Sequence, residues 1–300
     1  MTARIFIDGA VGTTGLQIKS RLENRDDIEL MTLAEEVRKD AGARADMLNS
    51  VDVAILCLPD AAAVEAAAMV TNTNVKIIDA SSAHRVADNW AYGFAELSLG
   101  QREIIRNATR VSNPGCYAVA SISMLQPLIF GGLIDADQGL SINAISGYSG
   151  GGKPLIADFE GGTDSDTPFF VYGLTLAHKH VPEIQKHGGL KVRPIMVPSV
   201  GNFAQGMIVQ LPLFADASAV FDALAKHYDA SRFVSVVKAN DMLRLEPQAL
   251  NGTNELKLHV CEADGQTVVM ALLDNLGKGA SGSCVQNLNI MLGVDEDTGL

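Results

Sequence analysis

The stretch Arg4–Gly15, RIFIDGAVGTTG, decides the fold of the first half of the chain. Residues 4–8 are typical of a short buried strand, and a helix through Leu16, Ile18 and Leu22 is predicted after the glycines. Glycines between a strand and a helix allow a tight turn and let the backbone approach a pyrophosphate at the helix N-terminus. We therefore favour a dinucleotide-binding loop over a plain structural turn, although the spacing is G-x-x-G-x-x-G. Its glycines are Gly9, Gly12 and Gly15.

The segments that follow continue an alternation of strands and helices. Strands are predicted at residues 28–33, 51–58 and 75–79, with an alanine-rich helix from Pro59 to Val70. The near-continuous apolar run at 51–58 is typical of a parallel strand that is buried on both faces. The pattern predicts an α/β fold with a Rossmann-type doubly wound parallel sheet.

After Cys116 the pattern is richer in strands and less regular, which predicts a second α+β domain with a mixed sheet. We expect residues 1–116 plus 279–300 to form the dinucleotide-binding domain and residues 117–278 to form the second one. The expected elements are strands at 140–145, 192–197, 203–211, 233–237, 255–261 and 267–273, a glycine-rich loop at 146–153, a helix from Ala217 to Tyr228 capped by Asp216, a hairpin turn at Asp264-Gly265 and a last helix from Gly279.

Composition narrows the class of protein. The 300 residues are 47% apolar and carry a net charge of −12, which argues against nucleic acid or an anionic membrane as a partner. No apolar stretch reaches the roughly 18 residues of a membrane span. The N-terminus runs directly into a strand, so we expect no signal peptide and a cytoplasmic location. The four cysteines form no CxxC pair, which argues against a zinc site and fits reduced thiols.

Cys116 is the most informative single residue. It follows Ser112-Asn113-Pro114-Gly115 and begins a predicted helix. The positive end of a helix dipole and free backbone N–H groups favour the thiolate, which is the nucleophilic form of cysteine. The position therefore suits covalent catalysis.

A cysteine nucleophile needs a group that handles protons. The best candidate is the segment His178–Ile184, HKHVPEI, in which Pro182 and Glu183 are expected to start a short helix. The residues alone leave open which of His178 and His180 is the base. No further ligand spacing makes this pair a metal site.

Two other features concern bound phosphates. Arg85, after a predicted strand, is expected either to grip a phosphate or to lie exposed in a loop. Glu35 and Glu36 stand where an acid holds the 2′-hydroxyl of NAD, whereas Arg38 and Lys39 suit the 2′-phosphate of NADP. The residues alone leave NAD and NADP open.

Across its whole length the chain resembles the N-acetyl-gamma-glutamyl-phosphate reductases of arginine biosynthesis, in their shorter form, which are related to the aspartate-semialdehyde dehydrogenases. The HxHxPE element separates these reductases from those relatives and carries most weight for the substrate. The matching segments are GAVGTTG (9–15), DASSAHR (79–85), SNPGCY (112–117), SGYSGGGK (146–153), HKHVPEI (178–184) and DNLGKGASGSCVQNLNIMLG (274–293).

The resemblance implies NADPH-dependent reduction of an acyl phosphate, N-acetyl-L-glutamyl 5-phosphate, to a semialdehyde through a thioester. It further implies a catalytic second domain that forms the interface of a homo-oligomer, a dimer or tetramer. The implied catalytic residues are the nucleophile Cys116, the acid/base His180, the nearby Glu183 and Asn113, which orients the acyl oxygen. The implied binding residues are Gly9, Gly12, Thr13, Thr14, Gly15 and Arg38 for NADP, Ser149, Gly150 and Asn275 for its nicotinamide end, and Arg85 and Ser82 for the substrate phosphate.

Two segments depart from the family pattern, and both concern substrate contacts. His84 stands where an apolar or aromatic residue is expected, and GFAEL at 93–97 replaces a form that contains proline. Two alternative functions remain: an aspartate-semialdehyde dehydrogenase, and a non-catalytic NADP-binding redox sensor that uses Cys116. The sensor would need no proton shuttle, so the HxHxPE element argues against it.

Overall fold

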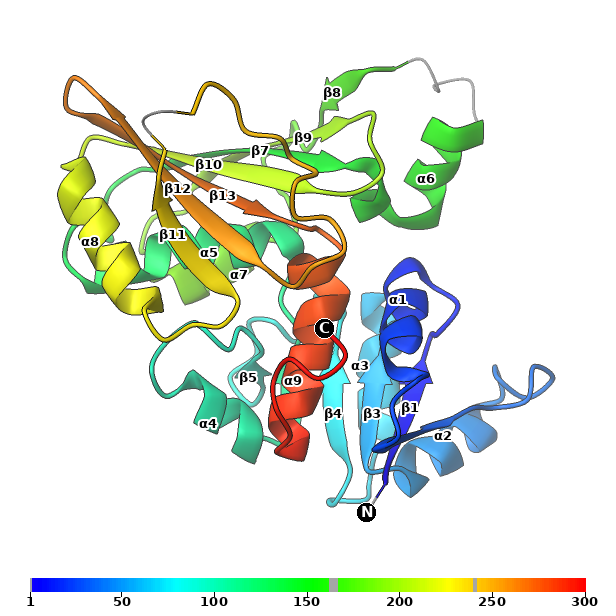
Figure 1. Ribbon diagram of the computed structural model, residues 1–300. Coiled ribbons are helices and arrows are strands. Elements are labelled where there is room, and N and C mark those ends of the chain that lie inside the picture. Colours follow the sequence, from blue (N-terminus) through cyan, green and yellow to red (C-terminus); the bar gives the residue numbers. More distant parts are fainter. Residues whose placement is uncertain (1, 162–166, 240–241) are drawn as a thin grey trace. The chain divides into compact units, whose positions relative to one another are not determined.

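A computed structural model describes residues 2–161, 167–239 and 242–300. The chain forms two compact units (Figure 1). Unit 1 consists of Met1–Ala95, Leu99–Pro114 and Ala280–Leu300, and unit 2 consists of Glu96–Ser98 and Gly115–Gly279. Four parts of the chain that the sequence analysis assigned to the first domain therefore belong to unit 2: Glu96–Ser98, Gly115, Cys116 and Gly279.

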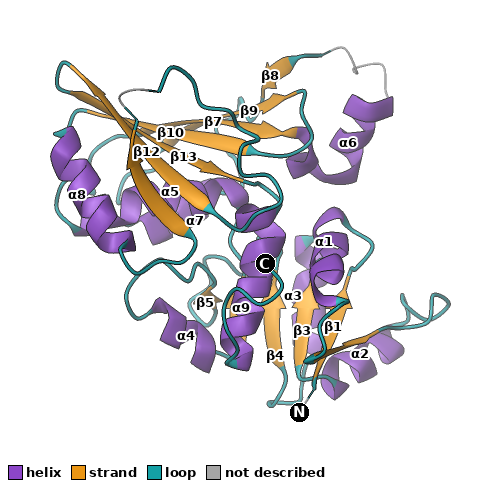
Figure 2. Cartoon of the chain, viewed as in Figure 1, coloured by secondary structure: helices purple, strands orange, loops and turns teal. Residues whose placement is uncertain are grey.

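Unit 1 contains a six-stranded, fully parallel sheet in the order β2-β1-β3-β4-β6-β5, which confirms the doubly wound fold. Figure 2 shows β1, β3 and β4 of this sheet side by side. The strands are β1 (Ala3–Asp8), β2 (Ile28–Met31), β3 (Val53–Leu56), β4 (Lys76–Asp79), β5 (Ala91–Tyr92) and β6 (Arg110–Ser112). The helices are α1 (Thr13–Leu22), α2 (Ala41–Ser50), α3 (Asp60–Met69), α4 (Gln101–Asn107) and α9 (Gly282–Leu292).

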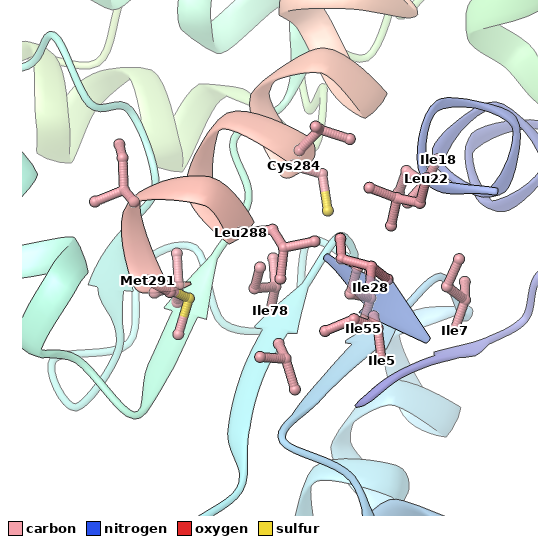
Figure 3. Close-up of a cluster of buried hydrophobic side chains, with 14 of the residues drawn as sticks. Ile5, Ile7, Ile18, Leu22, Ile28, Ile55, Ile78, Cys284, Leu288 and Met291 are labelled. Atoms are coloured by element: carbon pink, nitrogen blue, oxygen red, sulfur yellow. The ribbon is translucent and has the colours of Figure 1, made fainter. Parts of the chain in front are cut away.

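Both faces of this sheet are buried, because successive side chains of a strand point to opposite faces. On one face, isoleucines of β1, β3 and β4 pack against α1 and α9 (Figure 3). On the other face, Phe6, Leu56 and Ile77 pack with Leu48 of α2 and Ala66 of α3. The last helix of the chain thus completes the core of a sheet that the first strand begins. The residues labelled in Figure 3 are Ile5, Ile7, Ile18, Leu22, Ile28, Ile55, Ile78, Cys284, Leu288 and Met291.

Unit 2 contains a mixed seven-stranded sheet in the order β11-β12-β13-β10-β7-β9-β8, as the sequence predicted for the second domain. The strands are β7 (Ser141–Gly147), β8 (Phe169–Val171), β9 (Ile195–Gly201), β10 (Met207–Leu213), β11 (Val234–Lys238), β12 (Leu256–Ala263) and β13 (Gln266–Leu273). The helices are α5 (Cys116–Phe130), α6 (Gly152–Gly161), α7 (Val181–Gly188) and α8 (Ala217–Tyr228), with a 3-10 turn η1 (Tyr148–Gly151).

Local predictions in unit 2 have mixed outcomes. The hairpin is confirmed, since Asp264 and Gly265 both have positive φ, 50° and 77°, as a two-residue type I′ turn requires. The Asp216 cap is also confirmed, because its side chain accepts a hydrogen bond from the Ala219 N–H. The loop expected at 146–153 is wrong: it is the end of β7, η1 and the start of α6. The prediction failed because a run rich in glycine is typical of a loop, whereas here the chain forms a 3-10 turn that continues into a helix with a partly apolar face.

Candidate active site

In unit 1 the glycine loop lies at the switch point of the parallel sheet. The chain leaves β1 for β2 on one side and returns to β3 on the other, which opens a crevice at the carboxyl ends of β1 and β3. Gly9 has a φ of 90°, and a Cβ there would lie 2.3 Å from the carbonyl oxygen of Cys57. A Cβ at Gly15 would lie 2.6 Å from the Gly9 carbonyl oxygen. Close backbone packing therefore demands glycine at both positions.

Gly12 differs from these two glycines. A Cβ there would meet one atom within 4 Å, the Gly9 carbonyl oxygen at 3.5 Å, which is an ordinary contact. Gly12 is the N-cap of α1, no side chain caps the helix, and Thr13 and Thr14 form its first turn. Packing does not explain this glycine, but a phosphate approaching the helix N-terminus does. The loop thus fits a dinucleotide pyrophosphate.

A pocket of about 690 Å³ continues from this loop along the end of β2. Four basic side chains and two acidic ones line it, which favours a ligand with several phosphates. Arg44 is held by Asp8 at 2.7 Å, whereas Arg38 lies 3.4 Å from Glu35 and is more exposed. The surplus of positive charge fits the additional 2′-phosphate of NADP. The charged lining residues are Asp8, Lys19, Glu35, Arg38, Lys39 and Arg44.

Sequence reasoning missed Lys19 and Arg44 in this pocket. Arg44 lies on α2, a helix that the sequence analysis did not predict. Arg44 could have been suspected because it follows Glu35 and Arg38, the residues considered for the adenosine end of the cofactor. An isolated arginine in an alanine-rich stretch, however, is typical of a solvated surface residue.

The predicted phosphate residues Arg85 and Ser82 follow β4 in unit 1. Arg85 is buried, and its guanidinium donates to the carbonyl oxygens of Asn113 (3.0 Å) and Ala80 (3.1 Å). Ser82 bonds Asp60 through both its N–H (2.9 Å) and its hydroxyl (2.7 Å). The structure therefore brings Arg85 next to Asn113 and places Ser82 against the start of α3. In this structure both side chains hold the loop that follows β4.

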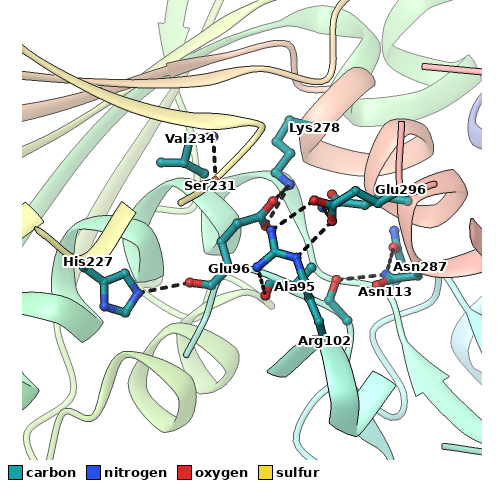
Figure 4. A network of polar contacts seen from close by, with 12 residues as sticks. Ala95, Glu96, Arg102, Asn113, His227, Ser231, Val234, Lys278, Asn287 and Glu296 are labelled. Atoms are coloured by element: carbon teal, nitrogen blue, oxygen red, sulfur yellow. Dashed lines mark hydrogen bonds and ion pairs between the residues drawn. The ribbon is translucent and has the colours of Figure 1, made fainter. Parts of the chain in front are cut away.

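Asn113 is equally well anchored within unit 1. Its N–H donates to the Asp79 carbonyl oxygen at 2.7 Å. Its side chain donates to the Ala280 carbonyl oxygen (3.0 Å) and accepts from Asn287 (3.1 Å; Figure 4). These bonds fix the backbone just before the cysteine loop.

The unusual His84 has a clear structural explanation. Its ring stacks on Trp90 with centroids 4.0 Å apart, and its Nδ1 lies 2.6 Å from the buried Asp79 carboxylate. An imidazole here fills the place of the aromatic residue that the family pattern leads one to expect.

In unit 2, Cys116 is the first residue of α5, as predicted, and is partly buried. Gly115 is the N-cap of this helix, and no side chain caps it. The N–H of Gly115 donates to Oε1 of Glu183 at 2.9 Å. Glu183 is fully buried in the first turn of α7, where a carboxylate is favoured by the helix dipole. Glu183 thus ties the backbone that presents the cysteine to the histidine segment.

Gly279 encloses Cys116 from another part of unit 2. A Cβ at Gly279 would lie 2.6 Å from the Cβ of Cys116 and 3.2 Å from its Cα. The Gly279 N–H is held by the Asp274 carbonyl oxygen at 3.0 Å. Sequence reasoning quoted this glycine within a motif but assigned it no role. Only the fold reveals that its missing side chain makes room for the nucleophile.

His178 and His180 lie side by side, with ring centroids 4.8 Å apart. His180 is the N-cap of α7 and buried, and its backbone N–H donates to Nδ1 of His178 at 3.2 Å. Nδ1 of His178 is therefore an acceptor, which leaves its proton on Nε2. Burial and, to a lesser extent, the positive charge of the nearby Lys179 lower the pKa of His178 from 6.5 to about 4. His178 is thus a neutral Nε2–H tautomer near pH 7.

Two tyrosines continue the chain of hydrogen bonds from His178. Nε2 of His178 lies 3.4 Å from the hydroxyl of Tyr172, which donates to the hydroxyl of Tyr117 at 3.2 Å. Tyr117 in turn donates to the Ser199 carbonyl oxygen at 3.4 Å. Burial raises the pKa of Tyr172 to about 12 and that of Tyr117 well above 10, so both stay protonated. The sequence analysis did not name these tyrosines.

The residues predicted for the nicotinamide end also lie in unit 2. The buried Asn275 donates to the Ser149 hydroxyl at 3.0 Å and accepts from the Gly206 N–H at 2.8 Å. Gly150 lies beside them, since a Cβ there would be 3.6 Å from Nδ2 of Asn275. The structure therefore brings all three predicted residues together.

Two other kinds of feature are absent from residues 2–161, 167–239 and 242–300. Within these ranges no helix has the length and apolar character of a membrane span. No group of three or more His, Cys, Asp or Glu side chains is arranged to hold a metal ion in the same part of the chain.

Comparisons with known proteins show the family of the chain. Residues 4–108 match the family model "Semialdehyde dehydrogenase, NAD binding domain", and residues 116–275 match "Semialdehyde dehydrogenase, dimerisation domain". The N-acetyl-gamma-glutamyl-phosphate reductase of Trichormus variabilis is 50% identical over 99% of both chains. That of Sinorhizobium medicae is 49% identical over 97% of this chain and 99% of the relative.

Solved structures support the fold alone. Aspartate semialdehyde dehydrogenase II of Vibrio cholerae is similar with a TM-score of 0.74, at 16% identity over 98% of this chain and 99% of that one. The Candida albicans aspartate semialdehyde dehydrogenase solved with NADP has a TM-score of 0.69 at 13% identity, covering 97% and 99%. By its nucleotide loop, its cysteine and histidine segments and its full-length relatives, the chain belongs to the N-acetyl-gamma-glutamyl-phosphate reductases of the semialdehyde dehydrogenase family.

Proposed function

We propose that the protein catalyses NADPH-dependent reductive dephosphorylation of N-acetyl-L-glutamyl 5-phosphate to N-acetyl-L-glutamate 5-semialdehyde and phosphate, a step of arginine biosynthesis. The observation that carries this proposal is Cys116 at the start of α5, which has no side-chain cap, tied through Gly115 to the Glu183 of the HxHxPE element. The relatives that share half of the sequence are named as reductases of this substrate.

The first step uses Cys116 as the nucleophile. Its thiolate, favoured at the N-terminus of α5, attacks the acyl carbon of the acyl phosphate. Phosphate leaves with the bonding electrons, and a thioester remains on Sγ. Asn113 belongs in this step as the residue that orients the acyl oxygen, and Arg85 and Ser82 as the residues that receive the phosphate. Each would have to release a hydrogen bond that it now makes within unit 1.

The residues of unit 1 suit NADP as the cofactor. Gly9, Gly12 and Gly15, with the N–H groups of Thr13 and Thr14, would hold the pyrophosphate, and Arg38 would meet the 2′-phosphate with help from Arg44. Ser149, Gly150 and Asn275 of unit 2 are assigned to the nicotinamide end. When bound, NADPH supplies the hydride that reduces the acyl carbon.

His180 is the acid/base of the proposed mechanism. It protonates the oxygen of the reduced acyl group and takes the proton back as the thiohemiacetal collapses, releasing the aldehyde and the Cys116 thiolate. His178 does not suit this role, because its pKa of about 4 keeps it neutral and Nδ1 already accepts the His180 N–H. Glu183 holds the histidine segment against the loop before Cys116.

The proposal also covers the oligomeric state and the cellular location. The match of residues 116–275 to a dimerisation domain supports a homo-oligomer, a dimer or tetramer, formed through unit 2. The reduced state of Cys116 that this chemistry requires favours the cytoplasm. Analytical ultracentrifugation of the purified protein tests the first property.

A coupled assay tests the function directly. Purified protein is supplied with N-acetylglutamate 5-semialdehyde, phosphate and either NADP or NAD, and then with aspartate semialdehyde in its place. We expect phosphate-dependent reduction of NADP with the acetylated semialdehyde. Turnover of aspartate semialdehyde alone would identify an aspartate-semialdehyde dehydrogenase, and NADP binding without turnover of either would favour the redox sensor.

A further inference from the structure

A buried ion pair lies in unit 2, outside the residues assigned above. Nζ of Lys278 is 2.9 Å from both carboxylate oxygens of Glu96, and their side chains are 0% and 1% exposed (Figure 4). Lys278 also lies over the ring of Phe233, 5.3 Å from its centroid. Ion pairs this deeply buried contribute little net stability, because both charges lose their hydration. Its presence therefore calls for a reason other than stability.

The position of Lys278 in the chain suggests what the ion pair is for. It directly precedes Gly279, whose Cα carries no side chain where Cys116 packs. Both residues lie in a single π-helical turn, η2 (Gly277–Ser281), which is wider than an α-helical turn and marks functional sites in other proteins. Gly277 is also enclosed, since a Cβ there would lie 2.1 Å from the Thr253 carbonyl oxygen. The turn therefore has little freedom to move away from the cysteine.

The other partner is anchored independently. Glu96 belongs to Glu96–Ser98, three residues of unit 2 that are flanked in sequence by segments of unit 1. Its carbonyl oxygen accepts from Nε2 of His227 on α8 at 3.1 Å. The backbone of the residue whose carboxylate binds Lys278 is thus fixed to α8 of unit 2.

We propose that the Glu96–Lys278 pair is a positioning device for the nucleophile. It clamps η2 so that Gly279 rests against Cys116 and holds the sulfur in one orientation at the N-terminus of α5. This inference rests on the proposed function for its effect on turnover, but the positioning of Cys116 itself can be measured without that function.

The decisive variant replaces both charges. Glu96→Leu/Lys278→Met fills the same space with apolar groups, and such replacements of buried pairs are often neutral or stabilising. We expect a melting temperature near that of the wild type, an unchanged KM for NADPH and a kcat lowered about 10- to 100-fold, the loss that a misplacement of about 1 Å produces. A matched control is Lys191→Met/Asp137→Leu, an exposed pair of unit 2 whose loss should leave the melting temperature, the KM and kcat unchanged.

Alkylation of Cys116 by iodoacetamide gives a second readout. We expect slower alkylation in the double variant, because a displaced sulfur loses the helix N-terminus that favours the thiolate. Glu96→Asp keeps the charges but shortens one arm, so it should fold and show a smaller loss of kcat and of alkylation rate. If both variants keep the wild-type kcat and alkylation rate, the pair does not position Cys116. If the wild type lacks turnover, the proposed function fails, while the alkylation comparison still decides the positioning role.

Discussion

The N-terminus of α1 in unit 1 and the N-terminus of α5 in unit 2 are built alike but serve different functions. Both helices follow a glycine N-cap, neither has a side-chain cap, and neither has an acid in its first turn. A Cβ at Gly12 meets nothing closer than 3.5 Å, whereas Cys116 is covered by Gly279 and its loop is bonded by Glu183. An open helix N-terminus suits a mobile phosphate group, and an enclosed one suits a covalent nucleophile.

The largest effect should come from removing the nucleophile at the enclosed start. Cys116→Ala deletes the atom to which the acyl group becomes bonded, so we expect kcat to fall by at least about 10⁴-fold. NADPH affinity should be unchanged, because the substitution alters none of the residues assigned to the nucleotide. Steady-state assays and a fluorescence titration with NADPH measure the two quantities. A variant with normal turnover would rule out the thioester.

Gly12→Ala tests the open start. The added methyl group meets no protein atom closer than 3.5 Å, so the melting temperature should stay near that of the wild type. It should nevertheless obstruct a pyrophosphate, and loss of one hydrogen bond to a charged group raises the Kd for NADPH about 10- to 100-fold. Gly9→Ala is the contrasting control, since φ of 90° and a 2.3 Å contact should destabilise the fold itself. Wild-type affinity in Gly12→Ala would mean that no phosphate lies there.

Glu183→Ala probes the bond that encloses the cysteine loop. The buried N–H of Gly115 would lose its acceptor, which costs about 1–3 kcal/mol of unfolding free energy. Glu183→Gln keeps an oxygen acceptor and should lose less. Urea denaturation of both variants, read by circular dichroism, measures the difference. Equal stability of the two variants would show that the hydrogen bond matters less than the charge.

The last effect concerns His178 and is absent at neutral pH. Its pKa falls from 6.5 to about 4 on folding, so between these values the unfolded chain binds a proton that the folded protein does not. Stability from this group is present above pH 6.5 and is lost as pH falls towards 4. His178→Gln should therefore flatten the loss of unfolding free energy in that window, by less than about 1.4 kcal/mol per pH unit. Denaturation at several pH values checks this, and parallel curves for both proteins would contradict it.

Sequence reasoning succeeded where the signal is local. Residues 4–15 and the Asp264-Gly265 turn were predicted because strand, turn and helix preferences depend on neighbours in the chain. It failed at 146–153, where glycines imitate a loop, and at α2, whose residues have almost no amphipathic pattern. In the site it named Cys116 and left His178 and His180 open, because a pKa depends on burial that no spacing reveals.

The sequence by itself determined the order of the elements, the nucleotide loop and the presence of a cysteine at a helix start. The tertiary structure alone decided that Glu183 bonds the backbone 68 residues earlier and that Lys278 pairs with Glu96 across 182 residues. It alone placed Gly279 against Cys116. The reason is physical: propensity and capping act within a few residues, whereas burial, charge pairing and steric room depend on which distant segments the packed core brings together.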